Sequence, residues 1–133
     1  MEKHIVKSKE MFYRGKSLEE LKTLDVREAA KYFTSRSRRS VLRNFDKIER
    51  FLKRCEKYNS KNKKIRTHLR DMVIVPKMVG MTLAVYNGKE FHDILINVHM
   101  IGHRLGEFSL SRSRVNHSSP GIGSTKSSAS KKK

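Results

Sequence analysis

Residues 81–96, MTLAVYNGKEFHDILI, hold the pattern that decides the fold. From Met81 to Tyr86 the side chains alternate in the manner of a strand. Asn87-Gly88 follows, a pair that favours a tight type I′ turn because that turn needs positive φ at both central positions. Glu90 to Ile96 then returns as a partner strand. The stretch therefore predicts an antiparallel β-hairpin.

The segments on either side of the hairpin complete a small α/β unit. Upstream, residues 72–75 (MVIV) are a short apolar run that Pro76 ends, and Gly80 marks a turn. Downstream, Asn97 is expected to cap a last short helix that runs through Met100 and Ile101. A small antiparallel sheet with a hairpin and a short helix is the predicted result.

Farther upstream the apolar residues take a helical period. Between Val41 and Tyr58 they recur in steps of three and four, the pattern of an amphipathic helix with a basic outer face. Two earlier segments open with capping signals, Ser17 three residues before Glu20 and Asp25 three residues before Glu28. The predicted class is α+β, with N-terminal helices, then the small sheet, then an extended basic C-terminal tail.

Positive charge is concentrated at both ends of the 133-residue chain, whose formal net charge is +18. Residues 1–64 carry 20 Lys and Arg against 9 Asp and Glu, residues 65–108 carry 5 against 4, and residues 109–133 carry 6 against none. This distribution predicts a nearly neutral α/β core (65–108) between a basic helical N-terminal extension (1–64) and a flexible basic tail (109–133), with both basic ends suited to lie against phosphates and the tail ordered only by RNA.

Such a balance is typical of a protein that binds a polyanion, usually nucleic acid. A membrane partner is not expected, because no basic amphipathic helix carries the apolar face that interfacial insertion needs and no segment approaches the ~20 apolar residues of a span. The first ten residues lack a signal-peptide pattern, and the single cysteine, Cys55, excludes an internal disulfide. These features favour a soluble intracellular protein.

Arginine offers phosphate a planar fork and lysine a mobile charge, so the basic residues are the first candidates for RNA contact, against the alternative of a solvated surface. The candidates for phosphate contact are Arg36, Arg38, Arg39, Arg66, Arg70, Lys77, Lys89, Arg104, Arg112, Arg114 and Lys126. The candidates for stacking or ribose contact are His68, His103, His117 and Tyr86. Gly121 and Gly123 would let the backbone approach RNA closely.

Other functions are weaker readings of the same residues. His99 and His103 have the i, i+4 spacing of zinc ligands, but Gly102 weakens that helix, and residues 121–127 lack the features of a nucleotide-binding loop. We expect neither metal nor cofactor. A basic DNA-binding protein is the alternative, although no recognition helix after a tight turn is evident, and a ribonuclease is more distant because nothing fixes an acid–base constellation.

Several stretches resemble one family, that of the nineteenth protein of the small ribosomal subunit in its archaeal and eukaryotic form. The resemblance is carried by Asn87-Gly88-Lys89, by Ile96, by the run IGHRLGEF (101–108) and by Ser111. It extends to residues 66–91 and to VNHSSPGIGSTKSS (115–128), and YRGKSLEEL (13–21) and RSRRS (36–40) resemble the extra N-terminal part of those members.

The resemblance implies a structural ribosomal protein, not an enzyme, whose mixed α/β domain binds small-subunit rRNA in the head of the subunit. It implies contact with the neighbouring small-subunit protein thirteen and a tail that approaches the decoding site, where tRNA and mRNA lie. Such a protein would support subunit assembly and translation on cytoplasmic ribosomes, and would pass through the nucleolus during assembly in a eukaryote. Between archaeal and eukaryotic sources the sequence leaves the choice open.

Overall fold

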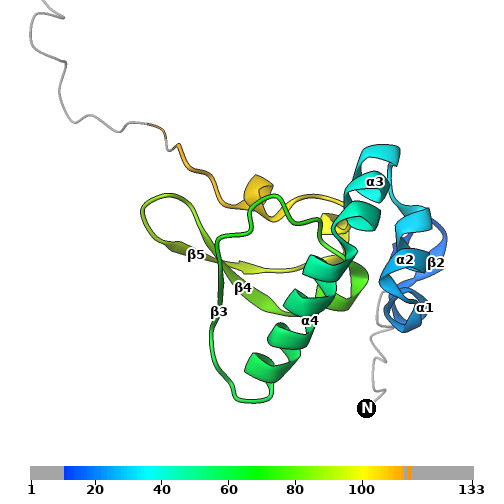
Figure 1. Ribbon diagram of the computed structural model, residues 1–133, viewed down its shortest axis with the longest axis horizontal. Coiled ribbons are helices and arrows are strands. Elements are labelled where there is room, and N and C mark those ends of the chain that lie inside the picture. The colour runs from blue at the N-terminus through cyan, green and yellow to red at the C-terminus, as the bar shows by residue number, and fades with distance from the viewer. Residues whose placement is uncertain (1–10, 113, 115–133) are drawn as a thin grey trace, which may run out of the picture.

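Helices from the N-terminal half pack beside a small sheet in the computed structural model, which describes residues 11–112 and residue 114 (Figure 1). This confirms the predicted α+β class. In chain order the elements are β1 (Phe12–Tyr13), β2 (Lys16–Ser17), α1 (Leu18–Thr23), α2 (Val26–Ala29), α3 (Ser35–Arg43), α4 (Phe45–Asn59), β3 (Ile65–Thr67), β4 (Thr82–Tyr86) and β5 (Phe91–Leu95). Short 3-10 helices occupy Ala30–Tyr32, Pro76–Met78, Val98–Met100 and Leu105–Phe108.

The helix-capping signals of the sequence operate as predicted. The Ser17 side chain accepts a hydrogen bond from the Glu20 N–H at the start of α1 (3.3 Å). Asp25 and Glu28 form the reciprocal capping box at the start of α2. The 3-10 helix Val98–Met100 also lies where a last helix was expected, although the Asn97 side chain does not cap it.

The single helix predicted from Val41 to Tyr58 is wrong at its start. α3 begins six residues earlier, at Ser35, and Asn44 separates it from α4 with φ −108° and ψ 23°. The Asn44 side chain and the Asn44 N–H both donate to the Ser40 carbonyl (3.1 Å each), so the side chain shares the acceptor of the last helical bond of α3. The basic run 36–40 is therefore helical.

β4 is the central strand of a three-stranded sheet. It pairs antiparallel with β5, with Tyr86 opposite Phe91, and this confirms the predicted hairpin. β3, which the sequence did not reveal, runs parallel to β4 with Arg66 opposite Ala84. The sheet is thus mixed, because the long connection from β3 to β4 allows the chain to cross over and re-enter in the same direction.

The turn of the hairpin differs from the type I′ prediction. Gly88 has a φ of +108°, but Asn87 is not among the residues with positive φ. Four residues form the loop, closed by a bond from the Asn87 N–H to the Glu90 carbonyl (3.0 Å). The Asn87 side-chain oxygen accepts from the N–H groups of Lys89 (2.9 Å) and Glu90 (2.8 Å), so asparagine serves here as a local acceptor.

The apolar run 72–75 is buried but is not a strand of this sheet. The Ile74 N–H donates to the His103 carbonyl (2.8 Å), and the Ile74 carbonyl accepts from the Gly102 N–H (3.0 Å). The run therefore pairs its backbone with the segment 102–105 and brings that segment onto the core.

The hydrophobic core lies between α4 and one face of the sheet. Ile48, Phe51 and Cys55 on α4 are buried in one cluster with Leu83 and Val85 on β4. Burial raises the pKa of the Cys55 thiol to about 11, so this side chain acts as a packing residue. None of the described helices is both long and apolar enough to cross a bilayer.

Candidate nucleic-acid interface

One face of α3 presents three exposed arginines. Arg36, Arg39 and Arg43 stand three and four residues apart, so their side chains share a face, and they line a hollow of about 570 Å³. None of the three forms an ion pair with a carboxylate in the part of the chain that the structure describes. The N-terminal end of the helix adds partial positive charge. This α3 arginine face is therefore suited to attract an anion.

Arg38, on the same helix, has a different environment. Its guanidinium group donates to the carbonyls of Ala30 (3.3 Å) and Lys31 (2.8 Å), and so ties α3 to the preceding turn. The structure thus gives Arg38 a role within the fold. Its predicted phosphate contact stays a prediction.

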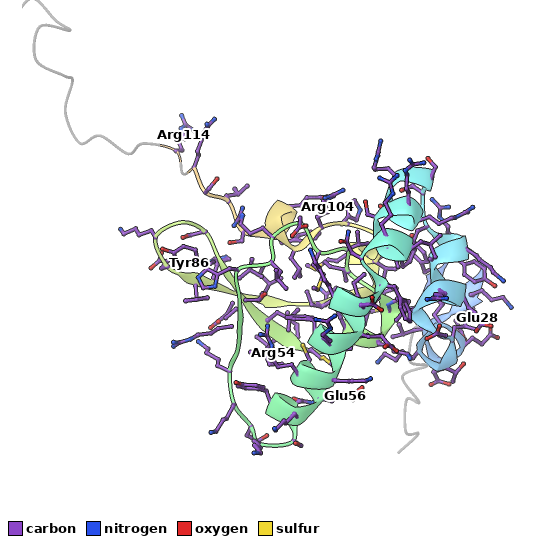
Figure 2. All side chains as sticks on the ribbon, in the orientation of Figure 1. Glu28, Arg54, Glu56, Tyr86, Arg104 and Arg114 are labelled. Atoms are coloured by element: carbon purple, nitrogen blue, oxygen red, sulfur yellow. The ribbon has the colours of Figure 1, made fainter. Side chains whose placement is uncertain are left out.

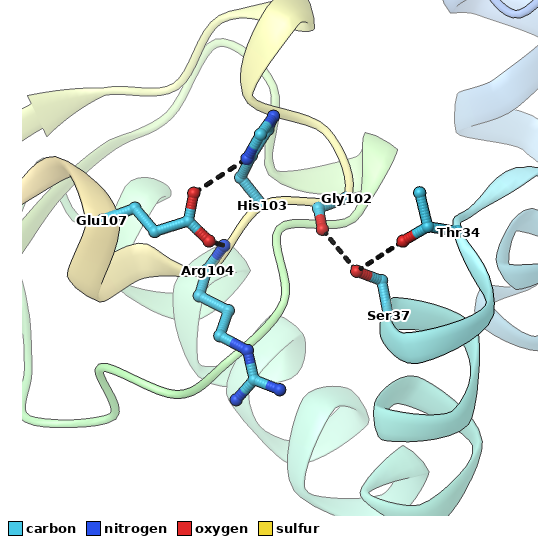
Figure 3. A network of polar contacts seen from close by, with 6 residues as sticks. All are labelled: Thr34, Ser37, Gly102, His103, Arg104 and Glu107. Carbon is cyan, nitrogen blue, oxygen red and sulfur yellow. Dashed lines mark hydrogen bonds and ion pairs between the residues drawn. The ribbon is translucent and has the colours of Figure 1, made fainter.

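α3 is also joined to the segment 102–107 by polar contacts (Figure 3). The Ser37 hydroxyl accepts from Thr34 (3.2 Å) and donates to the Gly102 carbonyl (2.8 Å). Gly102 has a φ of +83°, a conformation that favours glycine. The Arg104 guanidinium donates to the Ser40 hydroxyl (3.2 Å). These contacts fix the α3 arginine face relative to the sheet.

His103, Arg104 and Glu107 form the other half of that network. The Glu107 carboxylate lies 2.8 Å from His103 Nδ1 and accepts the Arg104 N–H (3.1 Å). This backbone bond, together with His103, lowers the pKa of Glu107. Arg36, His103 and Arg104 also line one hollow of about 440 Å³. No group of three or more metal-ligating side chains occurs among the described residues, His99 and His103 included.

Arg70 binds backbone rather than presenting its charge outward. Its guanidinium group donates to the carbonyls of Tyr86 (2.6 Å), Gly106 (3.2 Å) and Ser109 (2.6 Å). Gly106 is needed here, because a Cβ at this position would lie 3.0 Å from the Arg70 carbonyl oxygen. Arg70 therefore holds the end of the hairpin to the segment that follows it.

A third group of residues meets on the face of the sheet opposite the core. The rings of His68, Tyr86 and Phe91 have centroids 4.8 to 5.2 Å apart. The Arg66 guanidinium lies 5.3 Å from the Phe91 centroid. Three of these four were candidates from the sequence, counting Tyr86 as a stacking residue. Phe91 was missed because only the strand register brings it opposite Tyr86.

The remaining candidates are dispersed. Lys77 is half-buried in the 3-10 helix Pro76–Met78, Lys89 is exposed in the hairpin loop, and Arg112 is exposed beyond the last 3-10 helix. Arg114 is exposed where the chain leads away from the sheet (Figure 2). The candidates His117, Gly121, Gly123 and Lys126 lie outside the described residues, as does the expectation that RNA orders the tail.

A second basic surface lies at the end of α4, and the candidate set missed it. It surrounds Tyr58 and lines a hollow of about 390 Å³. The sequence did indicate this surface, through the basic outer face of the helix predicted from Val41 to Tyr58 and through the lysines that follow that helix. The residues are Lys53, Arg54, Lys57, Lys61 and Lys63.

An α+β core with basic surfaces on two helices, in a chain with 31 Lys and Arg but 13 Asp and Glu, defines a nucleic-acid-binding protein. The model of the family described as ribosomal protein S19 matches residues 38–117. Small ribosomal subunit protein uS19 of Halorubrum lacusprofundi is 48% identical over 126 residues, which cover 90% of this chain and 88% of that protein. The chain belongs to the ribosomal protein S19 family, as its sequence motifs indicated.

Proposed function

We propose that this chain is a structural constituent of the small ribosomal subunit that binds small-subunit rRNA and supports subunit assembly and translation. The α3 arginine face is the observation that carries the proposal. Arg36, Arg39 and Arg43 are exposed, share one helix face and have no described carboxylate partner. RNA phosphates would supply the missing negative charge, and binding would release counterions.

The finer placement rests on the family resemblance. In this proposal the domain sits in the head of the subunit near the decoding and aminoacyl-tRNA site, beside small-subunit protein thirteen. Residues 1–64 serve as a basic extension, residues 65–108 as the rRNA-binding core, and residues 109–133 as a tail near tRNA and mRNA. The protein works by binding rather than by catalysis, on cytoplasmic ribosomes, with nucleolar passage in a eukaryotic cell.

Sedimentation of a lysate tests the proposal. The full chain should co-sediment with small subunits and whole ribosomes at physiological salt. Replacing Arg36 and Arg39 by alanine should weaken binding to isolated small-subunit rRNA and reduce the slope of log affinity against log salt by roughly 1 per lost phosphate contact. Lys22→Ala with Lys31→Ala removes the same charge outside this face and is the matched control.

Detection of the chain only as free protein or on DNA would refute the ribosomal assignment. An equal loss of affinity and salt slope in both double variants would show that the α3 arginine face has no special part in RNA binding.

A further inference from the structure

The face of the sheet that points away from the core, here called the outer sheet face, carries side chains unlike those of an ordinary solvated surface. Alternate residues of β4 and β5 place Tyr86 and Phe91 side by side on it. Leu95, two pairs farther along, is 56% exposed. α4 packs on the opposite face, where its buried residues form one cluster with Leu83 and Val85. On this face Ala84 is buried between the Tyr86–Phe91 pair and Leu95, so the accessible part of the face is its aromatic end and Leu95. Figure 2 shows Tyr86 at the hairpin end of the sheet, far from α1.

The aromatic rings on this face are close together but not stacked in parallel. The interplanar angles are 48° between His68 and Tyr86, 53° between Tyr86 and Phe91, and 78° between His68 and Phe91. Tilted rings leave part of each π-face without a parallel partner. His68 is exposed and Tyr86 and Phe91 are half-buried, so solvent reaches this group.

The charges around the rings favour an anionic partner. Arg66 lies over the Phe91 ring, and Lys89 is exposed in the hairpin loop that follows Tyr86. Asp93, the one acidic residue of β5, is already paired with Lys64. A protein partner would need only apolar area here, whereas π-faces bordered by unpaired cations match a base with its phosphate.

We propose that the outer sheet face binds unpaired RNA bases by stacking on Tyr86, Phe91 and His68, with Arg66 holding the adjoining phosphate. The proposal rests on the proposed RNA-binding function and adds the kind of RNA that is bound at this face. Bases in a duplex already stack on one another, whereas those in loops and bulges offer their faces to aromatic side chains. The outer sheet face should therefore prefer single-stranded segments.

Binding of the full chain to a short unstructured RNA strand that carries 2-aminopurine, and to the blunt duplex of the same sequence, tests this. Tyr86→Leu with Phe91→Leu keeps apolar volume but removes two π-faces. It should weaken single-strand binding by about tenfold and abolish the 2-aminopurine fluorescence change, because stacking contributes on that order per base. Duplex affinity should stay within about twofold.

Two control variants show whether the effect comes from loss of the aromatic rings on this face. Tyr86→Phe removes the hydroxyl that donates to the Gly88 carbonyl but keeps the ring, so it should bind single strands like wild type. Phe12→Leu removes an exposed ring from β1, outside this face, and should change nothing.

Single-strand binding by the double leucine variant as tight as that of wild type would overturn the stacking proposal, as would an equal loss of duplex binding. If wild type binds both RNAs with equal affinity and the same salt slope, stacking is refuted and the proposed function stands. If wild type binds neither RNA, both proposals fail.

Discussion

At Arg70 a single guanidinium group meets backbone carbonyls from the hairpin and from the segment after it. At Arg36, on α3, the same chemical group is exposed and forms no hydrogen bond within the described residues. Both residues look alike in the sequence. Because of their surroundings, Arg70 stabilises the fold, whereas Arg36 is free to bind a partner at the surface.

Arg70→Ala should therefore destabilise the fold, whereas Arg36→Ala should not. Hydrogen bonds from a charged donor contribute about 1.5–3 kcal/mol, and the carbonyls left behind lose their partner. We expect the free energy of unfolding to fall by about 2 kcal/mol for Arg70→Ala and by less than about 0.5 kcal/mol for Arg36→Ala. Urea unfolding of the two variants measures this, and equal midpoints would contradict it.

Glu107 gives the fold a pH dependence. The Arg104 N–H and His103 lower the pKa of Glu107, so folding favours its ionised form. That contribution is complete above the ordinary glutamate pKa and is lost as the pH falls through the lowered value. Glu107→Gln should thus reduce stability at pH 7, by less than about 1 kcal/mol because the side chain is 49% exposed.

The comparison of wild type and Glu107→Gln in urea across acid pH checks this. The difference between their midpoints should shrink as the pH drops and vanish once Glu107 is protonated in the folded protein. A difference that is constant with pH would assign the effect of the substitution to packing.

Charge alone could not have separated these roles in the sequence. Arg70 acts through carbonyls at Gly106 and Ser109, which are distant in the chain, and such a pairing is visible only once the fold is known. The motif IGHRLGEF (101–108) did identify a segment of dense contacts, since Gly102, His103 and Glu107 all take part in the polar network.

Among the secondary-structure elements, the hairpin depends on the side chain of Asn87. Its oxygen accepts two backbone N–H groups within the loop, and alanine would leave both without this partner. Asn87→Ala should lower the free energy of unfolding by about 1–2 kcal/mol. Asn62→Ala, in the turn after α4, is the comparison, because Asn62 has positive φ but no side-chain hydrogen bond among the described residues.

Thermal melting of both variants measures the effect. Asn62→Ala removes only the side chain that makes positive φ easier at that position. Asn87→Ala removes the side-chain oxygen that accepts from the N–H groups of Lys89 and Glu90. If the Asn87 variant melts like wild type, the loop is held by Gly88 and the strand pairing instead.

Sequence periodicity predicted the hairpin and α4 because both are local patterns. It failed for β3, although Ile65 and Thr67 are buried on either side of the exposed Arg66, because three residues after a lysine-rich linker are too few to establish a period. It also left open the backbone partner of 72–75, where every residue is buried. An all-apolar run indicates burial without saying which segment its backbone pairs with.

The fold as a unit joins both halves of the chain. The described core cluster runs from Val26 to Leu105, so the N-terminal helices and the sheet are packed together. The sequence suggested this class but not the joint core, since contacts between α4 and the sheet depend on the tertiary arrangement. The hydrophobic cluster ends before the basic tail begins.

Deleting residues 115–133 should therefore leave the fold intact. We expect a change in melting temperature below about 3 °C, because none of the described core residues is lost. Subunits that carry the truncated protein should show impaired tRNA binding or late maturation, in line with the proposed position of the tail. A large drop in melting temperature, or normal maturation together with normal tRNA binding, would contradict the prediction.

The contacts of Arg70 with Gly106 and Ser109 also bear on how the protein is made. Translation delivers the N-terminal residues first, yet the last partners of the core and of Arg70 emerge only after about residue 109. Until then the first 64 residues, with their net charge of +11, leave the synthesising ribosome without a complete fold. The strongly basic N-terminal half is therefore exposed to nucleic acid before the core that holds it is complete, and folding is finished only late in synthesis.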